Sequence, residues 1–109
     1  MTEIRPIVNT VAERQLTFVD SSGEEQLVTV RIGVPYLEQE GGWRCPYEIQ
    51  GSDRTKRFGM VGIDSMQALI LSTQILKTEL SAWAKRHNGT FRWLSDDADT
   101  GFSDVKNEQ

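Results

Sequence analysis

The sequence contains few of the residues from which catalytic and metal sites are usually built. It has one cysteine and one histidine among 109 residues. A single cysteine cannot form an internal disulfide, which is typical of a reducing compartment, so we expect a cytoplasmic location. One cysteine and one histidine cannot complete a zinc site without carboxylates, and the spacings His-x-x-x-His and Cys-x-x-Cys are absent from the chain. The sequence therefore predicts neither a metal nor a cofactor.

Long apolar runs are also missing. No stretch approaches the roughly 18 apolar residues that a membrane-spanning helix needs, so we expect no membrane association. The first residues, Met1 to Pro6, lack a basic stretch followed by an apolar one, and no signal peptide is expected. With 38% hydrophobic and 26% charged residues, the composition is that of a globular domain with a modest core.

The net charge of −4 is concentrated at one end of the chain. Residues 95–109 carry five acidic residues and one lysine, whereas residues 1–94 hold 11 of each sign. A neutral body with an acidic tail attracts nucleic acid weakly, so we expect no nucleic-acid partner. Because the tail has few apolar residues, we expect residues 1–94 to form a single domain and residues 95–109 a flexible, disordered acidic tail.

A complete helix is predicted over residues 64–89. Asp64 occupies the position of a helix cap, and Gln67 three residues later fits the capping-box pattern. Asn88 and Gly89 provide a left-handed exit from the last turn. These start and stop signals make the helix the clearest element of the sequence.

Two apolar stripes run along this helix. On the opposite side from the main stripe, Leu71 and Ile75 lie with two alanines where a surface helix normally carries charge. This second stripe needs a cover, either from residues 90–94 folding back or from a second subunit in a symmetric dimer. The main stripe, predicted to pack on a sheet, spans an arc of about 140° and comprises Met66, Leu69, Ile70, Thr73, Leu76, Leu80, Trp83 and Ala84.

Four extended segments precede the helix, at residues 11–19, 27–34, 43–50 and 56–63. Alternation of apolar and polar residues is clearest in the second and third segments. Pro46 favours an edge position or a bulge, because proline has no amide hydrogen for a central ladder. The connections are short, so we predict an α+β fold: a three- to four-stranded antiparallel meander with the long helix packed on one face.

The candidate catalytic patterns each have a simpler explanation. Cys45 and His87 are the one possible nucleophile–base pair, but Cys45 shares a strand face with aromatic residues and His87 ends the helix, so structural roles are expected. The glycines around Gly59 and Gly62 lack the Gly-Lys-Ser/Thr ending of a phosphate loop, and Asp64 places a carboxylate where phosphate would bind. We expect the protein not to be an enzyme.

Two segments together resemble a known group of proteins. They are Trp43-Arg44-Cys45-Pro46 and Gly62-Ile63-Asp64-Ser65-Met66-Gln67-Ala68-Leu69. The pairing is similar to a family of small, uncharacterised bacterial proteins with a Trp-x-Cys-Pro strand and a Gly-x-Asp-Ser-x-Gln-Ala-Leu helix start. The resemblance covers roughly the middle half of the chain. It implies a bacterial source and a compact α+β domain, and it supplies no activity.

The leading functional hypothesis is a small, non-catalytic protein-interaction module that forms a homodimer or binds another protein. Its motivation is the second helix stripe together with aromatic side chains of the kind that dominate protein interfaces. The candidate interface residues are Leu71, Ile75, Trp43, Tyr47 and Trp93.

Two further hypotheses stay open. The first is an immunity or antitoxin-like protein that neutralises a basic partner through Asp96 to Glu108, or through Glu38 and Glu40. The second is a small-ligand-binding or catalytic domain with a pocket between sheet and helix. That pocket would use Tyr47, Arg44 and Asp64.

Overall fold

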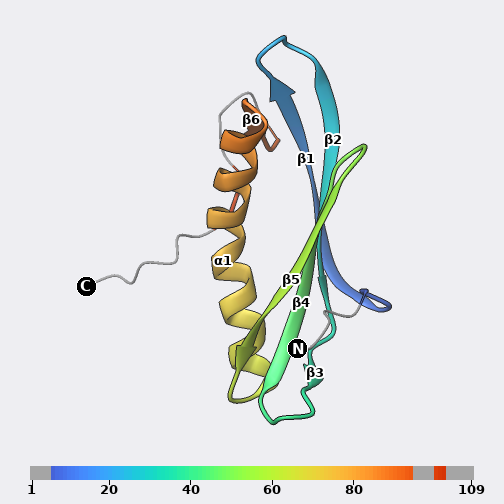
Figure 1. Ribbon diagram of the computed structural model, residues 1–109, viewed down its shortest axis with the longest axis vertical. Helices are drawn as coiled ribbons and strands as arrows, with labels where there is room; N and C mark the ends of the chain where they lie inside the picture. Colours follow the sequence, from blue (N-terminus) through green and yellow to red (C-terminus); the bar gives the residue numbers. More distant parts are fainter. Residues whose placement is uncertain (1–5, 95–99, 103–109) are drawn as a thin grey trace, which may run out of the picture.

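The protein is an α+β domain in which one helix lies along one face of a six-stranded sheet (Figure 1). The computed structural model describes residues 6–94 and 100–102. The helix and its placement on one face confirm the prediction, whereas the predicted number of three to four strands is wrong. The elements are β1 (Thr10–Asp20), β2 (Glu25–Gly33), β3 (Tyr36–Leu37), β4 (Trp43–Gln50), β5 (Thr55–Gly62), α1 (Ser65–Arg86) and β6 (Gly89–Arg92).

The sheet is built around a consecutive antiparallel meander. β1 pairs with β2, β2 with β4, and β4 with β5, each antiparallel. β3 pairs with the start of β4, on the side that β2 occupies farther along, and Pro35 lies in the break between β2 and β3. The two-residue β3 is too short to show an alternating pattern, which explains why the sequence did not indicate it.

β6 corrects one predicted cover of the helix. Residues 90–94 were one of two candidates to fold over Leu71 and Ile75, but Gly89–Arg92 instead pairs with β1. Phe91 stands opposite Phe18, and the two ring centroids are 4.9 Å apart. Gly89 is needed at the start of this strand, because a Cβ there would lie 2.4 Å from the Phe18 ring. The chain thus leaves the helix and returns to the far edge of the sheet.

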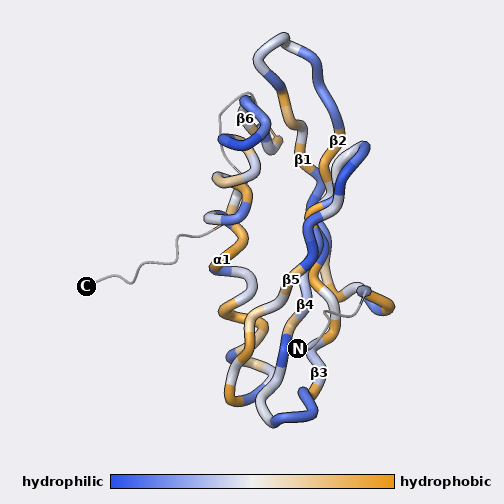
Figure 2. The backbone as a smooth tube through the Cα atoms, in the orientation of Figure 1, coloured by the Kyte–Doolittle hydropathy of each residue, from blue (hydrophilic) through white to orange (hydrophobic). Residues whose placement is uncertain are grey.

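Apolar residues recur along much of α1, and one side of it forms the core (Figure 2). Leu76, Leu80 and Trp83 are buried there, as predicted. Met66 and Ile70 were assigned to the same side, but they are 65% and 47% exposed, which is a correction. The helix is therefore rolled about its axis relative to the predicted arc.

Small residues explain this roll. Ala68 and Ser72 are completely buried, although the prediction placed neither in the main stripe. The end of β5 approaches the first helical turn so closely that a Cβ on Gly62 would lie 2.6 Å from the Ala68 nitrogen. Because a larger residue at either position would hold the two elements apart, glycine and alanine bring this side of α1 onto β5.

Ser72 links the helix to two strands through its hydroxyl group. The hydroxyl donates to the carbonyl oxygen of Cys45 in β4 at 2.7 Å and accepts from the amide of Met60 in β5 at 3.1 Å. Cys45 and Met60 are register partners, so the hydroxyl joins backbone groups of two neighbouring strands. This bridge could not be predicted, because a lone serine within a helix has no characteristic sequence pattern.

The predicted start of the helix agrees with the structure, whereas the helix ends earlier than predicted, at Arg86, and Gly89 already belongs to β6. Asp64 is the cap residue and accepts from the Gln67 amide at 2.8 Å, while the Gln67 side chain accepts from the Ile63 amide at 2.7 Å. His87 closes the other end, and Asn88 has the left-handed φ of 57° expected of the exit.

We predict that Ser72→Ala lowers the free energy of unfolding by about 1–3 kcal/mol, because it removes the buried hydroxyl that bonds the Cys45 carbonyl and the Met60 amide. Ser81→Ala, at an exposed position of the same helix, should change stability by less than about 0.5 kcal/mol. Urea denaturation of the three proteins measures the difference. Equal effects of the two substitutions would contradict the bridging role.

We also predict that Asp64→Ala destabilises the protein by about 1 kcal/mol through loss of the cap, whereas Asp64→Asn retains most of the stability, since asparagine caps helices as well as aspartate. Thermal and urea unfolding followed by circular dichroism test both substitutions. A loss of the same size with asparagine would show that the charge, and not the cap bond, is responsible.

Candidate functional site

The structure separates the possible nucleophile from its possible base. Cys45 is buried in β4 beside Ser72, its thiol lies 3.6 Å from the Gly33 carbonyl oxygen, and burial raises the pKa of the thiol. His87 is fifteen residues beyond Ser72 on α1, or roughly 22 Å along the helix axis. Its ring contacts Arg54 at 3.3 Å. The pKa of His87 is lowered, first by burial and then by its cationic neighbours. The arrangement therefore offers no activated thiolate.

Tyr47 belongs to the interior. Its side chain is completely buried, and its hydroxyl donates to Oε2 of Glu79 on the helix. The other carboxylate oxygen of Glu79 lies 3.1 Å from Nζ of Lys56 in β5. Burial, followed by the hydrogen bond to Glu79, raises the pKa of Tyr47. These contacts hold α1 against β4 and β5, and Tyr47 has no surface to offer to a partner in this fold.

The three residues of the hypothetical ligand pocket do not come together. Tyr47 faces the helix, whereas Arg44 lies on the opposite face of β4, where it pairs with the buried Glu38 and donates to the Gly59 carbonyl at 2.6 Å. Asp64 is used as the helix cap. Glu38, one of the two residues proposed as an acidic patch, is thus neutralised within the fold. The other proposed acidic segment, residues 96–108, lies outside the described residues apart from 100–102.

The hollows in the described part of the structure are lined by residues other than these three. One of about 160 Å³ lies between helix and sheet and is lined in part by Arg14, Val30, Leu76 and Phe102. This volume is below the roughly 300 Å³ at which small-molecule sites begin. Hollows of about 190, 210 and 690 Å³ lie elsewhere, and Tyr47, Arg44 and Asp64 line none of the four.

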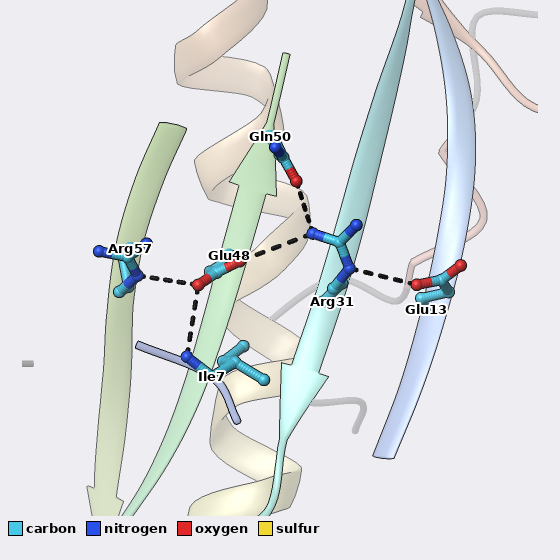
Figure 3. A network of polar contacts seen from close by, with 6 residues as sticks. All are labelled: Ile7, Glu13, Arg31, Glu48, Gln50 and Arg57. Atoms are coloured by element: carbon cyan, nitrogen blue, oxygen red, sulfur yellow. Dashed lines mark hydrogen bonds and ion pairs between the residues drawn. The ribbon is translucent and has the colours of Figure 1, made fainter. Parts of the chain in front are cut away.

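The sheet face turned away from α1 carries a row of alternating charges (Figure 3). We call Glu13, Arg31, Glu48 and Arg57 the charged row; they lie directly opposite one another across β1, β2, β4 and β5. Arg31 lies 3.3 Å from Glu13 and 3.6 Å from Glu48, and Arg57 lies 2.8 Å from Glu48. Opposite charges at facing positions favour this register over a shifted one.

Glu48 is the best-enclosed member of the charged row. Its side chain is 11% exposed, against 47% for Glu13. Besides the two arginines, it accepts from the Ile7 amide at 3.4 Å, so the N-terminal segment lies across this face. Sequence reasoning missed the row, because it depends on the exact strand register. The alternating signs at facing positions would have been the signal once that register was known.

The remaining candidate interface residues are partly covered. Trp43 is half-buried in β4 and packs against the core, and Trp93 packs there too, with the Arg14 guanidinium 3.9 Å from its ring. Leu71 and Ile75 are half-buried on α1. Ile75 lies one turn before Glu79, whose carboxylate contacts β5, so this side of the helix faces β5.

An apolar surface lies where β5 forms the edge of the sheet. Within the described chain β5 pairs with β4 alone, and its Phe58 and Val61 are each 43% exposed. We call Phe58, Val61, Leu71 and Ile75 the β5 edge surface. It unites two of the predicted interface residues with two that the sequence did not single out, because only the fold places the β5 edge beside this side of α1.

Comparison with known proteins assigns the chain to a family. The family model described as Domain of unknown function (DUF6968) matches residues 12–104. The chain belongs to this family. The match agrees with the resemblance to an uncharacterised family, and it supplies no specific function. No curated protein and no solved structure is significantly similar to the chain.

Residues 6–94 and 100–102 contain no group of three or more histidine, cysteine, aspartate and glutamate side chains placed to hold a metal ion. Among these same residues, no helix has the length and apolar character to cross a membrane.

We predict that Glu48→Gln lowers the free energy of unfolding by about 1–3 kcal/mol, because two arginines then share a poorly solvated site without their carboxylate. Glu13→Gln, at the exposed end of the charged row, should cost at most about 1 kcal/mol. Urea denaturation provides the comparison. A larger loss from Glu13→Gln would contradict the central position assigned to Glu48.

Proposed function

We propose that this protein is a non-catalytic interaction module that forms a homodimer through the β5 edge surface. The observation that carries the proposal is the combination of an edge strand, which among the described residues pairs with β4 alone, with exposed apolar side chains on both sides of it. An exposed strand edge is a template for pairing with another strand, and two copies related by a twofold axis would present the same surface to each other.

The charges of β5 do not oppose this pairing. Lysine and arginine on an edge strand normally discourage edge-to-edge association. In β5, however, Lys56 is paired with Glu79 on the helix, and Arg57 is paired with Glu48 in β4. Both cations therefore form ion pairs within their own subunit. A second copy would contact the apolar side chains of β5, Phe58 and Val61.

The side chains flanking the edge suit a continuous sheet across the dimer. Phe58 stands on the helix side of β5, with its ring edge-on to Tyr47 at a centroid distance of 6.3 Å. Leu71 and Ile75 line the same side from α1. Pairing of two β5 edges would bring these residues against their twofold equivalents, and it would cover the parts of Leu71 and Ile75 that the subunit itself leaves exposed.

The proposal extends to a reducing compartment such as the bacterial cytoplasm. Its support is that Cys45, the single cysteine, is buried and contacts the Gly33 carbonyl, so it needs no disulfide partner. The resemblance to bacterial proteins supports the source.

We predict that size-exclusion chromatography with light scattering gives twice the mass of one chain, and that Leu71→Lys weakens the dimer by at least about tenfold, because lysine cannot be buried unpaired at an apolar interface. Ile70→Lys is the matched control. Ile70 neighbours Leu71 on the helix but points about 100° away from it, so this substitution should leave the dimer intact.

A second pair of variants tests the strand itself. Val61→Lys should weaken the dimer, whereas Leu27→Lys, at an exposed apolar position on β2, should not. A monomer at all concentrations would contradict the proposal, and so would a dimer that survives Leu71→Lys and Val61→Lys.

A further inference from the structure

A segment from the C-terminal part of the chain borders the hollow between α1 and the β1–β2 strands. Phe102 forms one wall, and the other walls are Ala12, Glu13 and Arg14 of β1, Val30 and Ile32 of β2, and Thr73 and Leu76 of α1. Phe102 packs on the core from this side. The site lies across α1 from the β5 edge surface, so it is a separate surface and is independent of the proposed dimer.

Arg14 organises the contact. Its guanidinium carbon lies 3.9 Å from the centroid of the Trp93 ring and 4.6 Å from that of the Phe102 ring, so both aromatic residues contact the same cation. Nη1 of Arg14 also donates to the carbonyl oxygen of Thr100 at 3.1 Å. One side chain thus recognises an aromatic ring and a backbone carbonyl two residues before it.

The segment fits closely around Gly101. Its φ is 79°, which is unfavourable for other residues, and a Cβ at this position would lie 2.3 Å from the Trp93 ring and 2.6 Å from Nη1 of Arg14. The contact of this segment with Trp93 and Arg14 therefore requires glycine at position 101.

We propose that the surface around this hollow is a docking site for a partner peptide that presents an aromatic side chain after a small residue, and that residues 100–102 cover it when the partner is absent. The chain's own segment defines the chemistry, because the Thr100 carbonyl accepts from Arg14 and the Phe102 ring lies against the same guanidinium.

Because residues 100–102 already contact the site, an external peptide has to compete with them for it. A segment tethered by a short linker has an effective concentration in the millimolar range, so an external peptide must displace it. Variants that release residues 100–102 should therefore bind such a peptide more tightly than the unmodified protein does.

The experiment uses the full chain and a fluorescent probe peptide with the sequence of residues 95–105, Ser-Asp-Asp-Ala-Asp-Thr-Gly-Phe-Ser-Asp-Val. Fluorescence anisotropy measures its binding to the unmodified protein, to Phe102→Ala and to Gly101→Ala. Phe102→Ala removes the occupying ring, whereas Gly101→Ala keeps the ring but displaces the turn, so the two variants release the site in different ways. Circular dichroism confirms that each is folded.

We expect both variants to bind the probe at least about tenfold more tightly than the unmodified protein. A probe with its phenylalanine replaced by alanine should bind none of the three proteins, and Arg14→Ala combined with Phe102→Ala should lose binding of the intact probe.

Equal affinity of all three proteins for the probe, or no binding to either folded variant, would overturn the proposal. A dimer of the unmodified protein that disappears in Phe102→Ala but survives Leu71→Lys would overturn it as well. In that case the occupant would be the C-terminal segment of a second copy.

Discussion

The close approach of the first half of α1 to the β4–β5 pair is the constraint on which the rest of the structure depends. Gly62 and Ala68 allow this approach, and the Ser72 hydroxyl joins backbone groups of both strands to the helix. Once this end is placed, the remainder of the helix can lie only along the same face, where Leu76, Leu80 and Trp83 form the core with the strands. The roll that exposes Met66 and Ile70 is a consequence of the same contact.

That placement also determines which surfaces are left for partners. The helix covers the middle of one sheet face, and on its β5 side it leaves a strand edge, free of other described strands, next to half-buried Leu71 and Ile75. On its other side the helix leaves a hollow above β1 and β2, which Phe102 borders. The opposite sheet face is occupied by the charged row, whose members neutralise one another. The candidate interaction surfaces therefore lie on the two flanks of α1.

Elements with local signals could be predicted from the sequence. The helix cap at Asp64 and the exit at Asn88 depend on residues within one turn, and the strands near residues 28–34 and 43–50 alternate clearly. β6 could not be predicted in the same way, because its four residues gain their stability from pairing with β1, about seventy residues earlier. The charged row could not be predicted for the same reason, since Glu13 and Arg57 are brought into one row only by the strand register.

The candidate interface was predicted only in part, and the reason is again non-local packing. Leu71 and Ile75 were recognised because a second apolar stripe on a helix is visible in the sequence. Tyr47 was assigned to the same interface from its aromatic character, but its alternation with Cys45 and Ile49 directs it toward the helix, where Glu79 accepts its hydroxyl. Phe58 and Val61 became candidates only when the fold showed β5 at the edge of the sheet.

Hydrogen exchange measured by NMR tests most directly whether α1 is joined to the sheet through Ser72. The informative probe is the Met60 amide, which donates to the serine hydroxyl at 3.1 Å. If the account is correct, this amide exchanges as slowly as the buried ladder amides of β4 and becomes fast in Ser72→Ala. Rapid exchange of Met60 in the unmodified protein would show that the helix is not held there, and it would contradict the account.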